Sequence, residues 1–332
     1  MILSVDNARS LAEAAMTAVG HTRAEAAIIA DHLIDCELRG LSFGGLPRAL
    51  SVTEHIQLTQ PTRRPIEIVR ETPVSATLDG GNQVGYLVAR RATEIAIEKA
   101  AATGVAVVGA SKTWYTGMFS YYLEKITRAG LVGMIAGSGG PKVAPHGGTE
   151  PRFSTNPIAF GFPTQSHPVI WDIGTSSIML GEVMLAGRLG TELPEGRAFD
   201  TAGQPTRDPN AALDGAFTVW GGHKGSGLAM MVQLLGILGG QAAKPQGLTD
   251  CGFFAVVVDP AILGSTEDFR QKVTDFTDSV RSTNPLEPQA PVRVPFDRSV
   301  AERTRRIAAD AIEVPDQVVD ALTRISGVSA SA

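Results

Sequence analysis

An arginine closes a glycine-rich stretch near the N-terminus, ELRGLSFGGLPR at residues 37–48. Glycines permit positive φ angles and close backbone approach. Arg48 has the planar fork that binds a carboxylate or a phosphate through two hydrogen bonds. Taken alone, however, the stretch is more typical of a helix that ends at Gly40, a turn and a surface arginine.

Four further segments combine glycine with polar side chains. They are SKTWYTGMFSYY (111–122), GSGGPKVAPHGGTEPRFSTNPIAF (137–160), WDIGTSS (171–177) and WGGHKGSG (220–227). The last one leads into an apolar run, so the free N–H groups of a first helical turn, with Lys224 beside them, would suit a phosphate. Each segment taken alone is more typical of an ordinary loop or helix cap.

Helical periodicity dominates the two ends of the chain. Residues 4–20 and 22–40 carry apolar side chains at helical spacing, with Gly20 and Gly40 as stops. Thr22 and Glu25 have the spacing of a capping box. The patterns of residues 84–104, 301–313 and 315–326 also predict helices. We therefore expect helices at both termini.

The middle of the chain is richer in short β-branched or aromatic runs bounded by glycine or proline. These runs cover residues 104–110, 130–137, 157–163, 168–174 and 251–260. The pattern predicts an α+β protein whose two ends pack together. We expect a helical domain of residues 1–70 plus 299–332 and a mixed α/β core of residues 71–298. The order of the strands does not follow from the pattern.

Composition excludes several classes of protein. The chain has 332 residues, 43% of them hydrophobic and 19% charged, with a formal charge of −5. This acidic balance argues against nucleic acid or an anionic membrane as a partner. Cys36 and Cys251 provide no disulfide framework, which fits a reducing cytoplasm. Asp6 and Arg9 interrupt any N-terminal signal peptide. The apolar run 225–240 is short for a membrane span, so we expect a buried helix there.

Several familiar chemical signatures are absent from the sequence. It contains no G-x-G-x-x-G after a strand, no phosphate-binding loop of the Walker type, no H-E-x-x-H and no G-x-S-x-G. A doubly wound dinucleotide-binding domain is therefore disfavoured. The 6 histidines are scattered, so no metal site is predicted.

Four ordered motifs together resemble those of a known family. TNPIAF, WDIGTSS, LPEGRAFDTAGQPTRDP and GGHKGSGLAMMV are similar to motifs of the malate/L-lactate dehydrogenase family of the non-Rossmann type. The resemblance covers essentially the whole chain. It implies a homodimer, a largely antiparallel sheet and an NAD(P)-binding fold. The implied chemistry is reduction of C=O or C=N beside a carboxylate, or the reverse oxidation, with NADH or NADPH.

The resemblance also implies roles for individual residues. Arg48 would hold the substrate carboxylate. From the residues themselves, we expect Thr155 and Ser42 to help, and Phe43, Gly44, Trp114 and His146 to line the substrate pocket. The implied cofactor-binding positions are Ile170, Trp171, Asp172, Ile173, Gly174, Thr175, Ser176, His223, Lys224, Asn156, Pro157, Phe296, Asp297 and Arg298.

The sequence departs from the family pattern at the positions that would supply the general acid. The family reads R-G-x-x-S-H-G-x-x-R where this chain reads RGLSFGGLPR, so Phe43 and Gly44 stand at the serine and the histidine. A second family histidine aligns with Tyr115. The family's P-G-E turn reads PFDR at residues 295–298.

Loss of both histidines bears on the substrate. General acid–base catalysis contributes about 10²- to 10⁴-fold, or roughly 3–5 kcal/mol of barrier. A ketone needs that proton when hydride arrives, whereas a cyclic iminium already carries it. We therefore predict a reductase of small cyclic imino-2-carboxylates, Δ1-piperideine-2-carboxylate or Δ1-pyrroline-2-carboxylate, that forms the L-amino acid.

Two alternatives stay open. In the first, Tyr115 or His146 replaces the lost acid and the substrate is a 2-oxo acid. Tyr115 is equally compatible with a packed aromatic residue, and His146 is more typical of a loop histidine. The second alternative is a relative that binds a dinucleotide without turning it over.

Overall fold

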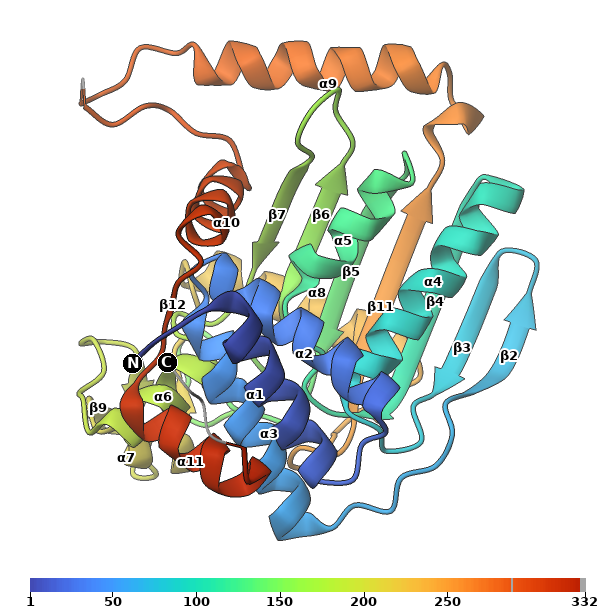
Figure 1. Cartoon of the computed structure of the whole chain (residues 1–332). Helices are drawn as coiled ribbons and strands as arrows, with labels where there is room; N and C mark the ends of the chain where they lie inside the picture. Colours follow the sequence, from blue (N-terminus) through green and yellow to red (C-terminus); the bar gives the residue numbers. More distant parts are fainter. Residues whose placement is uncertain (288, 329–332) are drawn as a thin grey trace.

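A mixed sheet of seven strands forms the centre of the molecule (Figure 1). We describe residues 1–287 and 289–328 of the chain in a computed structural model. In spatial order the strands are β2 (Glu67–Thr72), β3 (Ser75–Asp79), β4 (Val105–Thr113), β11 (Cys251–Val258), β5 (Val132–Ser138), β6 (Ile158–Phe162) and β7 (Val169–Ile173). Of these neighbours β3 and β4 run parallel and the other pairs are antiparallel. The expected largely antiparallel sheet is confirmed.

Helices cover both faces of this sheet. Helix α4 (Gly85–Thr103) and helix α5 (Phe119–Arg128) pack on one face, where Ala92 and Ile126 join a buried core with Val108 and Phe253 of the strands. On the other face α8 (His223–Leu238) packs through Val232. The five strands expected from β-branched runs all form, because helices on both faces bury such runs.

The two ends of the chain meet in a helical layer beside this core (Figure 1). Its helices are α1 (Val5–Ala18), α2 (Arg23–Leu38), α3 (Leu46–Thr59) and α11 (Asp316–Ser326), with α10 (Asp297–Ala309) packed on α2. Strand β1 (Ile2–Leu3) pairs with β12 (Ile312–Glu313).

The expected division into domains at 70/71 and 298/299 remains a prediction. The first of these boundaries falls inside β2. The last residues of the expected helical domain, 329–332, lie outside the described part of the chain.

Local signals explain where the N-terminal helices begin and end. The expected capping box is present, since Thr22 accepts from the Glu25 amide and Glu25 accepts from the Thr22 amide. Gly20 and Gly40 have φ angles of 87° and 75°, which residues with a Cβ rarely adopt. These glycines therefore end α1 and α2.

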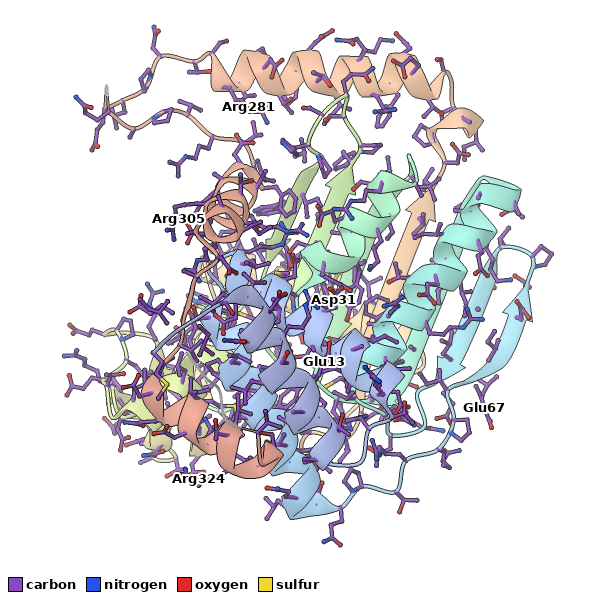
Figure 2. All side chains as sticks on the ribbon, in the orientation of Figure 1. Glu13, Asp31, Glu67, Arg281, Arg305 and Arg324 are labelled. Atoms are coloured by element: carbon purple, nitrogen blue, oxygen red, sulfur yellow. The ribbon has the colours of Figure 1, made fainter. Side chains whose placement is uncertain are left out.

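A smaller lobe and one outlying helix complete the fold. The lobe consists of the sheet β10–β8–β9 (Ala216–Phe217, Ala198–Phe199, Pro205–Thr206) with α6 (Leu180–Leu189) and α7 (Pro209–Asp214). Helix α9 (Thr266–Arg281), preceded by the short helix η2 (Pro260–Ile262), runs across the ends of β6 and β7 (Figure 1). Arg281, which is labelled in Figure 2, lies at the end of α9 and pairs with Asp297 at 2.8 Å.

The expectation of a buried helix at 225–240 needs correction. The helix forms, and Val232 packs on the sheet, but the opposite side is open. Met230, Leu234 and Leu238 are exposed by 50%, 51% and 71%. The run is apolar all round because it has an exposed apolar face as well as a buried one. Across the described residues, no helix has the length and apolar character needed to cross a membrane.

Candidate active site

Arg48 is a buried cation in the first turn of α3. Arg48 is 9% exposed. Its Nη1 is 3.7 Å from the Met184 sulfur, and its Cζ is 4.3 Å from the centroid of the Tyr115 ring. Within the described part of the chain, no carboxylate forms an ion pair with Arg48. A buried guanidinium of this kind is well suited to bind an anionic ligand.

Tyr115 lies under Arg48 with a strained backbone. Its φ angle is 55°, in the left-handed region that bulky residues rarely adopt. Such residues concentrate at functional sites. The ring also packs on Trp114, which is fully buried and donates from Nε1 to the Asn82 carbonyl at 3.2 Å. Trp114 therefore supports Tyr115 from the protein side.

A short helix, η1 (Ser42–Gly44), carries the residues that replace the family's serine and histidine. Phe43 and Arg48 both press on Gly181 of α6, where a Cβ would lie 2.7 Å from Phe43 Cδ2 and 2.6 Å from Arg48 Nη2. Gly44 packs on Cys36, whose Sγ would be 3.3 Å from a Cβ at position 44. The structure thus brings η1 to the same region as Arg48.

The TNP turn precedes β6 and is held from several sides. The carbonyl of Thr155 accepts the amide of Thr175 at 2.9 Å. Asn156 is fully buried with φ 35°, and its Nδ2 donates to the Ala229 carbonyl at 2.8 Å. The Oδ1 of Asn156 has no hydrogen-bond partner among the described residues. The Pro157 carbonyl accepts the amide of Gly137 in β5 at 2.9 Å. This turn therefore fastens β6 to α8 and to β5.

The segment expected to bind the cofactor is β7 with the residues that follow it. Ile170 is buried, whereas Trp171 is 42% exposed and stacks on Phe160. Ile173 packs on the core beneath α8. Beyond the strand, a Cβ on Gly174 would lie 2.4 Å from the Met179 sulfur, and Thr175 and Ser176 are buried.

Asp172 of this strand caps a helix. Its Oδ2 accepts the Ser120 amide at 2.8 Å, in the first turn of α5. Burial raises the pKa of the carboxyl group to about 6, although hydrogen bonds from Ser120 and Phe119 oppose the change. A helix N-terminus stabilises the ionised form. These contacts of Asp172 position α5.

The N-terminus of α8 is basic. The helix begins at His223, next to Lys224, after Gly221 and Gly222 with φ angles of 61° and 59°. The His146 ring lies 6.2 Å from the His223 ring, between centroids. First-turn amides, a lysine and two imidazoles thus gather at this end of α8, which is a setting for a phosphate.

Close contacts join the two halves of the site. The Trp220 amide donates to the Thr175 carbonyl at 2.8 Å, so the segment after β7 bridges from the TNP turn to the start of α8. On the other side, the Tyr115 backbone lies close to the Cys251 thiol. A Cβ on Gly139 would lie 3.2 Å from that sulfur and 3.1 Å from Ser154 Oγ, just before the TNP turn. A continuous set of contacts therefore runs from Arg48 to α8.

The PFDR turn lies at a different place, where α10 begins. Phe296 has φ 84°, and the Arg39 guanidinium lies 4.7 Å from its ring centroid. Asp297 is paired with Arg281, and Arg298 approaches Gly40. The contacts that connect Arg48 with α8 do not pass through this turn.

Several residues of the site carry no motif signal. Met184 comes from α6, Cys251 from β11 and Glu37 from α2, and tertiary packing brings them in. His55, two turns after Arg48 on α3, packs on Trp114 at 4.5 Å between centroids. The spacing of His55 is a usable signal, because residues seven apart share a helix face.

Comparison with known proteins identifies the family. A family model described as malate/L-lactate dehydrogenase matches residues 3–323. The chain belongs to this family. It is 33% identical to a malate/(S)-sulfolactate dehydrogenase of Methanothermus fervidus, over 98% of this chain and 97% of the relative. It is 32% identical to a (2R)-3-sulfolactate dehydrogenase (NADP(+)) of Chromohalobacter salexigens, over 97% of both chains.

Solved structures give the same result. A dehydrogenase from Sinorhizobium meliloti superposes with a TM-score of 0.90 at 29% identity, over 98% of both chains. A Δ1-piperideine-2-carboxylate reductase from Pseudomonas syringae pv. tomato superposes with a TM-score of 0.84 at 26% identity, over 98% of this chain and 99% of the other. The expected family, the non-Rossmann α+β fold and a nicotinamide cofactor, NADH or NADPH, are therefore confirmed.

Proposed function

We propose that this NAD(P)-dependent oxidoreductase reduces a small cyclic imino-2-carboxylate to the L-amino acid. Δ1-Piperideine-2-carboxylate and Δ1-pyrroline-2-carboxylate are the candidate substrates. The observation that carries the proposal is the buried, unpaired guanidinium of Arg48 beside Phe43 and Gly44, within the described structure. Arg48 would bind the carboxylate, and the Phe43 ring would lie against the substrate ring. The likeness to the Pseudomonas reductase supports this choice.

The missing histidines favour an imine for a chemical reason. An iminium ion that accepts hydride becomes a neutral amine, so no proton has to move at that moment. A 2-oxo acid becomes an alkoxide and needs a donor, which contributes about 10²- to 10⁴-fold. Phe43 and Gly44 provide no acid, and the Tyr115 hydroxyl faces the Met184 sulfur, 4.0 Å away.

A 2-oxo acid or 2-hydroxy acid substrate is the second candidate. The relatives named for malate and sulfolactate favour it, since both names denote carboxylates that Arg48 would also bind. Tyr115, next to Arg48, would then donate the proton, with Thr155 and Ser42 as further polar contacts. His146 lies beside His223 at the other end of the site, which makes it the weaker candidate for that role.

The residues present fit a dinucleotide. We assign its phosphates to the first-turn amides of α8, with His223 and Lys224. The unpaired Oδ1 of the buried Asn156, within the described structure, offers an acceptor to an amide N–H. Residues 170–176 and Pro157 would complete the cofactor site between these groups. When bound, the reduced nicotinamide supplies the hydride.

Two further sets of proposed cofactor residues would act from a distance. Asp172 would act indirectly, through the helix α5 that it caps. Phe296, Asp297 and Arg298 would contribute if part of the cofactor approaches from the side of α10.

A second copy of the chain would cover the apolar face of α8. The exposed apolar side chains of this helix, each 36–71% exposed, are Met230, Met231, Leu234, Ile237 and Leu238. Contiguous exposed apolar surface of this kind marks an interface between proteins, and most soluble oligomers pair identical chains. We therefore propose a homodimer with α8 at its contact surface.

The test is a substrate screen with purified chain. Cyclic imino-2-carboxylates and linear 2-oxo acids are compared with NADH and with NADPH, and kcat/KM is measured for each pair. Faster reduction of the imino acids supports the proposal. Titration of nicotinamide fluorescence in parallel separates a chain that turns substrate over from one that only binds the dinucleotide.

A further inference from the structure

A buried carboxyl group lies beneath the loop that carries the substrate arginine. Glu37, near the end of α2, is 0% exposed. Its Oε1 accepts the Leu46 amide at 2.8 Å, in the first turn of the helix that bears Arg48. Its Oε2 is buried and forms no well-aligned hydrogen bond with any described residue. One oxygen is thus fixed and the other is free to bind a proton.

Backbone packing holds this carboxyl group against the loop. A Cβ at position 45 would lie 2.2 Å from Glu37 Oε1, so Gly45 leaves the space that the carboxyl group fills. The Ser42 hydroxyl of η1 lies near enough to interact with the carboxyl group as a hydrogen-bonding neighbour. Glu37, Ser42 and Arg48 therefore meet at one loop.

The surroundings of Glu37 shift the pKa of its carboxyl group toward neutral pH. Burial raises the pKa of the carboxyl group to about 7, while the Leu46 amide, Arg306 of α10 and the Ser42 hydroxyl oppose the change. Arg306 also donates to the Glu37 backbone carbonyl at 2.8 Å. The neighbouring Cys36 thiol stays protonated, because burial raises its pKa well above the usual value. A carboxylic acid in such a setting exchanges its proton near neutral pH.

We propose that Glu37 and Ser42 form a proton relay that replaces the missing histidines. The Ser42 hydroxyl gives its proton to the substrate nitrogen or oxygen and takes a proton from Glu37 Oε2, which leaves a carboxylate. For an imine this transfer precedes the hydride and creates the iminium. For a 2-oxo acid it accompanies the hydride, whose electron pair forms the new C–H bond while the C=O π pair takes the proton. Solvent then returns a proton to Glu37.

This inference rests on the proposed reductase activity but not on the choice between an imine and a 2-oxo acid. The competing role for Glu37 is purely structural, since Oε1 caps the first turn of α3. Glutamine keeps that cap and the volume, yet has no acidic proton. Glu37→Gln therefore separates the two roles.

The experiment measures kcat and KM for reduction from about pH 5 to pH 9 in the wild type, Glu37→Gln, Ser42→Ala and the double variant. The full chain is used with whichever substrate the wild type reduces best. We expect wild-type kcat to fall as pH rises through about 7, since the donor must be protonated. With a 2-oxo acid, each variant should lose roughly 10²-fold or more in kcat and the dependence near pH 7, with KM nearly unchanged. With an imine, which already carries its proton at low pH, the loss in kcat should appear toward about pH 9. The double variant should lose little more than either single one.

Glu13→Gln, on α1 in Figure 2, makes the same chemical change away from the site and should leave the profile intact. Wild-type kcat and pH dependence in Glu37→Gln would overturn the relay, as would a loss of kcat that only follows a lower Tm. Ser42→Ala keeps the buried carboxyl group and so provides an independent test. Preference of the wild type for a 2-oxo acid would overturn the proposed substrate and leave the relay standing.

Discussion

The guanidinium of Arg48 lies over the ring of Tyr115, with its Cζ 4.3 Å from the ring centroid. The ring takes up one face of the cation, while Gly181 and Phe43 confine its edge. A cation–π contact contributes about 0.5–2 kcal/mol, and here it also fixes the plane of the guanidinium. The pair therefore presents a pre-oriented fork to a ligand.

Replacing this arginine tests its role as the carboxylate anchor. Arg48→Met should raise KM about 10- to 100-fold, because charge-assisted hydrogen bonds contribute about 1.5–3 kcal/mol. The Tm should change little, since loss of the cation–π contact is offset by removal of a buried charge that has no ion-pair partner in the described structure. Arg70→Met, at an exposed position of β2, is the matched control. An unchanged KM for Arg48→Met in steady-state kinetics would remove Arg48 from the site.

Two substitutions at Tyr115 distinguish support of the Arg48 side chain from donation of a proton. Tyr115→Phe keeps the ring under Arg48 and removes the hydroxyl, so we expect kcat to change less than about tenfold. Tyr115→Leu removes the ring and should raise KM several-fold, because it loses the cation–π contact. A loss of about 10³-fold in kcat for Tyr115→Phe, with normal KM, would instead make Tyr115 the acid.

Restoring the family's residues tests the link between acid and substrate. Phe43→Ser with Gly44→His rebuilds the serine–histidine pair. Position 44 is tight, with Cys36 Sγ 3.3 Å from a Cβ there, so Cys36→Ala is added to make room. We expect kcat/KM for a 2-oxo acid to rise at least about tenfold relative to Cys36→Ala alone, because a general acid accelerates that reduction. If kcat/KM for the 2-oxo acid does not rise in a folded variant, the missing histidine does not determine which substrate is reduced.

The raised pKa of Glu37 predicts a pH-dependent contribution to stability, which can be measured independently of activity. Its pKa is about 7 in the folded chain, against a usual 4.5. The folded state thus holds a proton that the unfolded state releases, and this contribution to stability is lost as pH rises from about 4.5 through 7. The free energy of unfolding of Glu37→Gln relative to the wild type should therefore increase by about 1–3 kcal/mol between about pH 5 and pH 8. Denaturant unfolding at the two pH values measures it, and a constant difference would contradict the raised pKa.

The apolar face of α8 predicts the effect of a charge on assembly. Leu234→Asp should turn a dimer into a monomer, because it would bury an unpaired carboxylate at the contact. Leu263→Asp is the control, since Leu263 is 88% exposed and follows η2. Light scattering on both variants gives the masses. A monomeric wild type would contradict the proposed homodimer.

Periodicity predicted the elements that bury one continuous face. The N-terminal helices, α4 and five strands of the sheet are visible in this way because their apolar residues face a core. Strand β2 is mostly exposed, and the strands of the small lobe have two residues each. No apolar run in the sequence therefore predicts these strands. Helix α9 carried local signals, since Ser265 caps it and acids occupy its first turn, but it has few apolar residues.

The site divides in the same way. Motif resemblance suggested Arg48, the TNP turn and the start of α8 as candidate site residues, because their signals are local in sequence. It did not place Glu37 beneath Ser42, because that contact depends on how α2 packs against the turn before α3. The capping of α5 by Asp172 was hidden for the same reason, since β7 and α5 meet only through tertiary packing.

The most direct test of the central claim is the ratio of two specificity constants in the wild type. We predict that kcat/KM for Δ1-piperideine-2-carboxylate, measured with the preferred nicotinamide cofactor at neutral pH, exceeds kcat/KM for pyruvate, because hydride transfer to an iminium ion requires no accompanying proton transfer. A ratio below one, with pyruvate or another linear 2-oxo acid reduced faster, would contradict the account.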